Sequence, residues 1–102
     1  MMLNIGKSVI EVKDNDETTK LNWVDACEKA LEAGYRLPTR KELKAIHKAL
    51  HEKSLGGFKN EPYWTTDKNG KENAWYLSFI NGNDNWSKMT DTYNVRMIKT
   101  LG

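Results

Sequence analysis

Short motifs in a fixed order characterise this chain: Trp23-Val24-Asp25-Ala26-Cys27, Arg36-Leu37-Pro38-Thr39, Tyr63-Trp64-Thr65, Ala74-Trp75-Tyr76 and Asn94-Val95-Arg96. The first two lie in or beside stretches with helical periodicity, and the later ones lie in β-prone or alternating stretches. None of them pairs a nucleophile with a base or forms another recognisable catalytic arrangement. We therefore expect a binding domain and not an enzyme.

The length and composition fit one domain spanning residues 1–102, since a chain of this size buries roughly 60 to 70% of its unfolded surface. The 16 basic and 14 acidic residues are interspersed, which does not favour nucleic acid as a partner. One cysteine cannot form an internal disulfide, and the first residues lack the apolar run of a signal peptide. No stretch approaches the ~20 apolar residues that span a bilayer. A cytoplasmic protein without a membrane partner is expected.

Apolar spacing predicts two helices. The first begins after Asn22, a good N-cap, and stops at Gly34. The second follows Pro38, because Thr39 and Glu42 have the spacing of a capping box. Their apolar stripes are Trp23, Ala26, Cys27, Ala30 and Leu31 in the first, and Leu43, Ile46, His47 and Leu50 in the second.

Strand signals surround the helices. Residues 5–12 are rich in β-branched side chains and predict one strand, followed by a solvated loop at 13–17. Further strands are predicted at 63–66, at 75–79 with Trp75, Leu77 and Phe79 pointing inward, and at 93–99 with Val95 and Met97 on one face. The dipeptides at 69–70 and 81–82 mark tight turns. The order predicts an α+β domain in which two helices pack against a small antiparallel sheet.

The motif order resembles a bacterial family, the C-terminal domain of the collagen-like adhesins with its relatives of unknown function. The resemblance covers about residues 23–98 and implies a C-type-lectin-like fold. Two features differ: Gly34-Tyr35 stands where relatives commonly have Asp-Trp, and their second cysteine is absent. The structural motif residues are Trp23, Arg36, Leu37, Pro38, Trp64, Trp75 and Arg96. A shared fold does not by itself assign a function.

The arginines and aromatic residues of these motifs have two interpretations. Arg36 or Arg96 can bind a carboxylate or phosphate with two parallel hydrogen bonds, but a structural role with an acidic or carbonyl partner is favoured. The tryptophans Trp64 and Trp75 are expected in the core. Tyr76 and Trp86 have polar neighbours, and they remain candidates for stacking against a sugar or a base.

Metal and catalytic chemistry have weaker support. The residues Asn81, Asn83, Asp84, Asn85 and Asp91 offer oxygen ligands for calcium, but a polar hairpin loop is the favoured explanation of this cluster. Glu61-Pro62 matches half of the Glu-Pro-Asn sugar motif of lectins, with Tyr63 in place of the asparagine. His47 and His51 have the i, i+4 spacing of zinc ligands without the glutamate of that motif. Cys27 shares the apolar stripe of its helix, which favours a buried and unreactive thiol. No metal, cofactor or catalytic residue is assigned.

Residues 81–94 combine Trp86 and Tyr93 with small amides and hydroxyls, which is typical of recognition loops. We expect a non-enzymatic intracellular binding module, a regulator or inhibitor of bacterial or phage origin, whose partner is an unidentified protein. The alternative is a lectin-like domain that binds a small molecule or a glycan; the oligomeric state stays open. The expected binding residues are Tyr76, Asn83, Asp84, Asn85, Trp86, Lys88, Asp91 and Tyr93.

Overall fold

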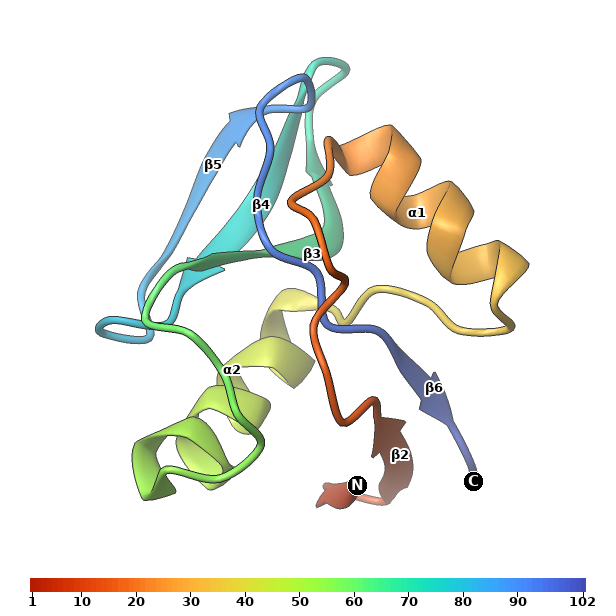
Figure 1. Cartoon of the computed structure of the whole chain (residues 1–102), viewed down its shortest axis with the longest axis vertical. Coiled ribbons are helices and arrows are strands. Elements are labelled where there is room, and N and C mark those ends of the chain that lie inside the picture. The colour runs from red at the N-terminus through yellow and green to blue at the C-terminus, as the bar shows by residue number, and fades with distance from the viewer.

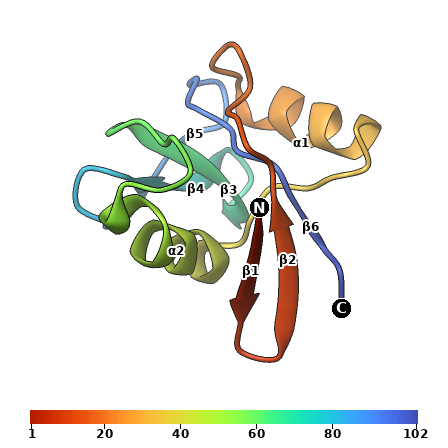
Figure 2. The ribbon, with the colours of Figure 1, turned by 60° about the horizontal axis from the view of Figure 1, so that its bottom comes forward.

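The computed structural model describes all residues, 1–102, and contains two helices and two small sheets. The elements are β1 (Met2–Ile5), β2 (Ser8–Val12), α1 (Trp23–Glu32), α2 (Arg40–Ala49), a 3₁₀ turn η1 (His51–Lys53), β3 (Pro62–Asn69), β4 (Asn73–Ser78), β5 (Asp84–Lys88) and β6 (Ile98–Thr100). Both sheets are antiparallel, with strand orders β3-β4-β5 (Figure 1) and β1-β2-β6 (Figure 2). The predicted α+β class is confirmed, but the strands form two sheets where the sequence predicts one.

Helix α1 begins and ends where the sequence predicts. The side chain of Asn22 accepts a hydrogen bond from the backbone N–H of Asp25 at 2.9 Å, and Gly34 follows the helix with φ at +78°. Glycine adopts this left-handed conformation without strain and so ends the helix. The buried residues of α1 are Trp23, Ala26 and Ala30. Leu31 is 77% exposed, contrary to the prediction. Successive residues of a helix are rotated by roughly 100°, so Leu31 points away from the buried side on which Ala30 lies.

Helix α2 starts with the predicted capping box. The hydroxyl of Thr39 accepts from the Glu42 backbone N–H at 3.1 Å, and the Glu42 carboxylate accepts from the Thr39 backbone N–H at 2.8 Å. The apolar stripe is buried as predicted and consists of Leu43, Ile46, His47 and Leu50. These side chains hold α2 against one face of the β3-β4-β5 sheet.

Three strand predictions need correction. Residues 5–12 are not one strand but belong to a hairpin that spans 2–12, because Gly6 has φ at +60° and allows β1 to turn back onto β2 with Ile5 opposite Ser8. The predicted strand at 93–99 is shorter: only Tyr93 and Asn94 form isolated bridges, residues 95–97 connect the sheets, and β6 at 98–100 pairs with β2 (Figure 2). Within the stretch 81–94, which the sequence predicts as a loop, residues 84–88 form strand β5.

The β3-β4-β5 sheet separates two cores. Side chains alternate along a strand, so Tyr63 and Leu77 face α2, while Trp64 and Ala74 face α1. Trp64 is fully buried as predicted. Trp75 lies on the α2 face but is only partly buried, contrary to the prediction, because the guanidinium of Arg40 and not an apolar residue of α2 covers its ring.

The motifs that carry the family resemblance join distant segments. The indole N–H of Trp23 donates to the carbonyl of Thr65 at 2.8 Å, and the indole N–H of Trp64 donates to the carbonyl of Leu21 at 2.8 Å. Leu37 is buried in the α1 core, and the carbonyl of Pro38 accepts from the Thr66 N–H at 2.8 Å. These residues therefore attach α1 and the chain leading to α2 to strand β3.

Candidate functional site

Strand β5 forms an open edge of its sheet and carries half of the expected binding residues. Opposite residues of an antiparallel pair point to the same face, and Trp86 lies opposite Trp75 while Asn85 lies opposite Tyr76. One face of β5 therefore carries Asp84, Trp86 and Lys88, and the other carries Asn85 and Ser87. Asn83 lies before the strand, in its connection to β4.

We call the first of these surfaces the tryptophan face; it consists of Arg40, Trp75, Trp86 and Lys88. Trp86 is 51% exposed and meets Trp75 edge-on, with 5.1 Å between the ring centroids. The guanidinium carbon of Arg40 lies 3.6 Å from the centroid of the Trp75 ring. An exposed indole is thus supported by a second indole, which is in turn covered by a cation.

Ion pairs hold Arg40 in this position. Its Nη2 atom lies 2.8 Å from Oδ2 of Asp84, and Nζ of Lys44 lies 3.1 Å from the same oxygen. Partial burial opposes ionisation of Asp84, but hydrogen bonds from Arg40 and Lys44 outweigh it, so the pKa of this carboxyl lies below its usual value. The backbone N–H of Arg40 donates to Oδ2 of Asp67 at 2.8 Å. Three cations, those of Arg40, Lys44 and Lys88, accompany the carboxylates of Asp84 and Asp67 here, so the surface has an excess of one positive charge.

The opposite face of β4 and β5 is built from tyrosines. The rings of Tyr76 and Tyr93 are 4.8 Å apart, and Tyr93 also packs edge-on against Trp64 at 4.8 Å. Its hydroxyl donates to Oγ of Ser87 at 3.1 Å, and Ser87 in turn donates to Asp91. Burial, followed by the neighbouring Tyr93, raises the pKa of Tyr76.

The structure therefore separates two residues that the sequence analysis treats as anchors of one surface. Trp86 lies on the tryptophan face, whereas Tyr93 is partly buried against the α1 core. They lie apart because the chain turns after β5 ends at Lys88, and Tyr93 then forms an isolated bridge with Leu21 beside the α1 core. Arg40 was not among the expected binding residues. Only its place at the start of α2, opposite the strand carrying Trp75, brings it to the site.

The two motif arginines have structural partners. The guanidinium of Arg36 makes two parallel hydrogen bonds to Glu42, at 2.7 and 2.8 Å, which raise the pKa of Arg36 and lower that of Glu42. Arg96 is 1% exposed, and its Nε donates to Asp16 at 2.8 Å. Its remaining nitrogens donate to the backbone carbonyls of Lys13, Gly56 and Gly57. Both guanidinium groups thus hold structural partners, as the favoured interpretation of the sequence expects.

The oxygen ligands considered for calcium do not converge on one point. The Asp84 carboxylate faces two cations, the Asp91 carboxylate accepts from Ser87, and the Asn81 amide oxygen accepts from the Asn83 N–H at 3.0 Å. No group of three or more His, Cys, Asp and Glu side chains is placed to hold a metal ion. The side chain of Glu61 accepts from Nδ2 of Asn94 at 2.9 Å.

The histidines and the cysteine are packing residues in this structure. His47 is buried with Nδ1 at 3.4 Å from Glu52, while Nε2 of His51 lies 2.7 Å from the amide oxygen of Asn60. Burial, the largest effect, raises the pKa of the partly buried Cys27 thiol. A raised pKa leaves less thiolate at neutral pH and makes this cysteine a weaker nucleophile.

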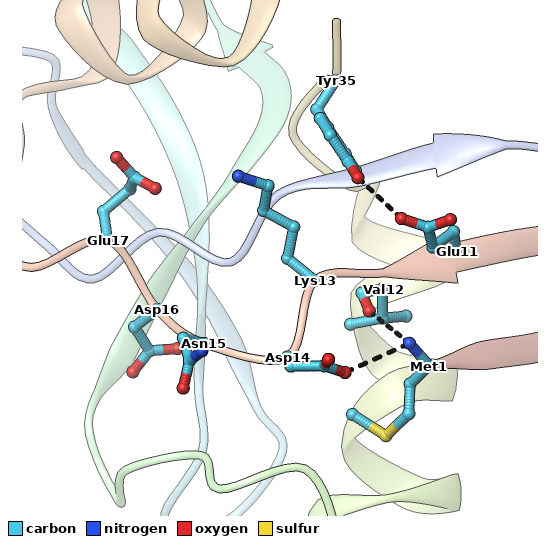
Figure 3. Close-up of a pocket in the computed structure, with 9 residues that line it drawn as sticks. All are labelled: Met1, Glu11, Val12, Lys13, Asp14, Asn15, Asp16, Glu17 and Tyr35. Carbon is cyan, nitrogen blue, oxygen red and sulfur yellow. Dashed lines mark hydrogen bonds and ion pairs between the residues drawn. The ribbon is translucent and has the colours of Figure 1, made fainter. Parts of the chain in front are cut away.

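A cavity of about 320 Å³ lies beside the loop that follows β2 (Figure 3). Its lining includes four carboxylates, and each one has a partner. Glu11 accepts from the Tyr35 hydroxyl at 2.6 Å, which raises the pKa of Tyr35, and Asp14 lies 3.2 Å from the amino group of Met1. Asp16 binds Arg96, and Glu17 lies 3.4 Å from Lys29. The carboxylates that line the cavity therefore make contacts within the fold.

Residues 9–99 match the model of the Lcl C-terminal domain family. The matched region contains both helices and every strand of the β3-β4-β5 sheet, so the tryptophan face lies within it. No curated protein matches the chain. None of the helices has the length and apolar character needed to cross a membrane.

Proposed function

Because the chain belongs to the Lcl C-terminal domain family and displays an exposed, supported tryptophan, we propose that it is a non-enzymatic protein-binding module that uses the tryptophan face. The observation that carries this proposal is Trp86, half-exposed and held edge-on against Trp75. Tryptophan is enriched among the residues that contribute most to binding, since its large rigid ring buries much area at little entropic cost.

The surroundings of Trp86 support a partner that carries both apolar and acidic side chains. Arg40 is already held by Asp84 and by the ring of Trp75, so ordering it on binding loses little further entropy. The excess positive charge of Arg40, Lys44 and Lys88 suits carboxylates of the partner. A stable interface buries about 800 Å² on each side, so the tryptophan face would form its centre with exposed residues of α2 around it.

We also propose that the fold is C-type-lectin-like and that the module acts inside a bacterial cell as a regulator or inhibitor. Two helices with two antiparallel sheets, the last strand paired beside the first hairpin, support such a fold. A single cysteine left without a disulfide suits a reducing compartment.

The alternative proposal is a glycan that stacks on Trp86. An exposed indole ring with polar neighbours suits the apolar face of a sugar. Calcium would not be required for this mode, because Asp84 is already neutralised by Arg40 and Lys44.

The test is affinity capture with purified tagged protein followed by measurement of the affinity of any captured protein. Trp86→Ala should weaken that affinity by at least tenfold, as expected for a central interface residue that contributes more than about 1.4 kcal/mol. Leu31→Ala is the matched control, because it removes an exposed apolar side chain from α1, far from the site. Equal affinity of the wild type and the Trp86 variant would refute this face. A glycan array that responds to the wild type, and not to Trp86→Ala, would favour the alternative.

A further inference from the structure

The backbone of β5 directs hydrogen-bonding groups to its outer edge, where no other strand pairs with them. The N–H of Ser78 donates to the carbonyl of Asn83, and the N–H of Met89 donates to the carbonyl of Glu72. Because hydrogen-bonded pairs alternate along an antiparallel ladder, residues 85 and 87 also direct their backbone groups toward β4. The backbone groups of Asp84, Trp86 and Lys88 therefore point away from the sheet. In Figure 1 no other element lies beyond β5 on this side.

The sequence of this edge is complementary to itself when a second copy runs antiparallel with Trp86 opposite Trp86. In that register Asp84 lies opposite Lys88 of the other copy, and the same pair recurs on the other side of the twofold axis. The register also matches the hydrogen-bond phase, because the paired residues are those whose backbone groups point outward. Opposite charges placed directly across from each other stabilise a strand pair.

Local contacts leave room for this pairing. The contacts of Arg40 and Lys44 with Asp84 all go to Oδ2, so Oδ1 can accept from a lysine of the second copy. The outward N–H of Trp86 is bonded to the side-chain oxygen of its exposed neighbour Asn85 at 2.8 Å. Rotation of that exposed side chain would free the N–H for the second strand. The carbonyl of Lys88 accepts from the Asp91 N–H and has a second lone pair.

We infer that a second copy of this chain is the natural occupant of the β5 edge. Two copies would join their sheets through the pairs 84–88, 86–86 and 88–84 into one six-stranded sheet. The pairing also places the two tryptophan faces side by side on one surface, because paired residues share a face. This inference does not rest on the proposed function. The strands are only five residues long, so association should be weak and dependent on concentration.

The first experiment is sedimentation equilibrium over a concentration series. The mass of the wild type should rise from 11.8 kDa toward twice that value. Lys88→Glu should weaken dimerisation on the order of tenfold, since it creates two acidic pairs across the axis. Lys7→Glu is the matched control, with the same charge change in the exposed turn between β1 and β2, and it should dimerise like the wild type. A monomeric wild type, or equal dimerisation of the Lys88 variant, would overturn the inference.

The second experiment tests the register by cross-linking in a Cys27→Ala background. A hydrogen-bonded pair has Cα atoms about 5.5 Å apart, within the range of a disulfide, so Trp86→Cys should oxidise to a covalent dimer. Asn85→Cys is the control, because its symmetry mate would be diagonal at roughly 7 to 8 Å and should cross-link poorly. Equal cross-linking at both positions would refute the register. Capture of a partner that depends on Trp86, by a protein that stays monomeric, would overturn this inference alone.

Discussion

Removing the guanidinium of Arg96 should destabilise the fold more than any change at the tryptophan face. Arg96 is 1% exposed, pairs with Asp16, bonds three backbone carbonyls and stacks over Phe58 with its guanidinium carbon 4.0 Å from the ring centroid. Arg96→Met keeps an apolar stem but leaves the Asp16 carboxylate without its cation. Breaking a buried ion pair in this way costs about 3 to 5 kcal/mol.

That loss is large compared with the total stability of a domain of this size, which is about 5 to 10 kcal/mol. A loss of 3 kcal/mol or more lowers the melting temperature of such a domain by at least about 12 °C. Thermal and urea unfolding followed by circular dichroism measure the effect. Arg96→Lys should fall between the wild type and the methionine variant, because lysine keeps the charge but not the fork that reaches Gly56 and Gly57.

The matched control is Arg40→Met. Arg40 also pairs with a carboxylate and stacks on an aromatic ring, but its side chain is 37% exposed, so the loss should stay under about 1 kcal/mol. The comparison isolates burial as the cause. Equal losses for the two variants, or a loss below about 1 kcal/mol for Arg96→Met, would refute the reasoning.

Two further predictions concern acid stability and a close backbone approach. The folded-state pKa of Glu42 lies below its ordinary value of 4.5, mainly through Arg36, so its contribution is present above that pH and is lost as the pH falls through the lower folded value. Glu42→Gln should therefore flatten the acid limb of urea stability measured against pH; an unchanged limb would contradict this. Gly82→Ala should destabilise by more than about 1 kcal/mol, since its Cβ would meet the His47 ring at 2.9 Å at a φ of +76°. Gly70→Ala has a similar φ and open space, so equal urea midpoints for the two variants would contradict the steric argument.

The helices could be predicted from the sequence because their signals are local. A capping side chain and its target lie three residues apart: Asn22 caps Asp25, and Thr39 caps Glu42. An apolar stripe likewise repeats every three or four residues. The end of α1 is also a local signal, because it depends only on a glycine with positive φ at position 34. Strand β5 was not predictable in this way, since residues 84–88 are polar apart from Trp86 and become a strand only because β4 offers them a ladder of hydrogen bonds.

The sequence by itself determined the α+β class, both helix starts and the burial of Trp64 and Ile46, because these depend on residue type and on short spacings. Only the tertiary structure decided that Trp86 and Tyr93 lie on opposite faces and that Arg40 covers Trp75. Segments far apart in the chain meet at these places, as they do in the ion pair of Arg96 with a residue 80 positions away. Such contacts depend on which strand edges pair and which faces the helices cover, and short-range sequence patterns do not predict either.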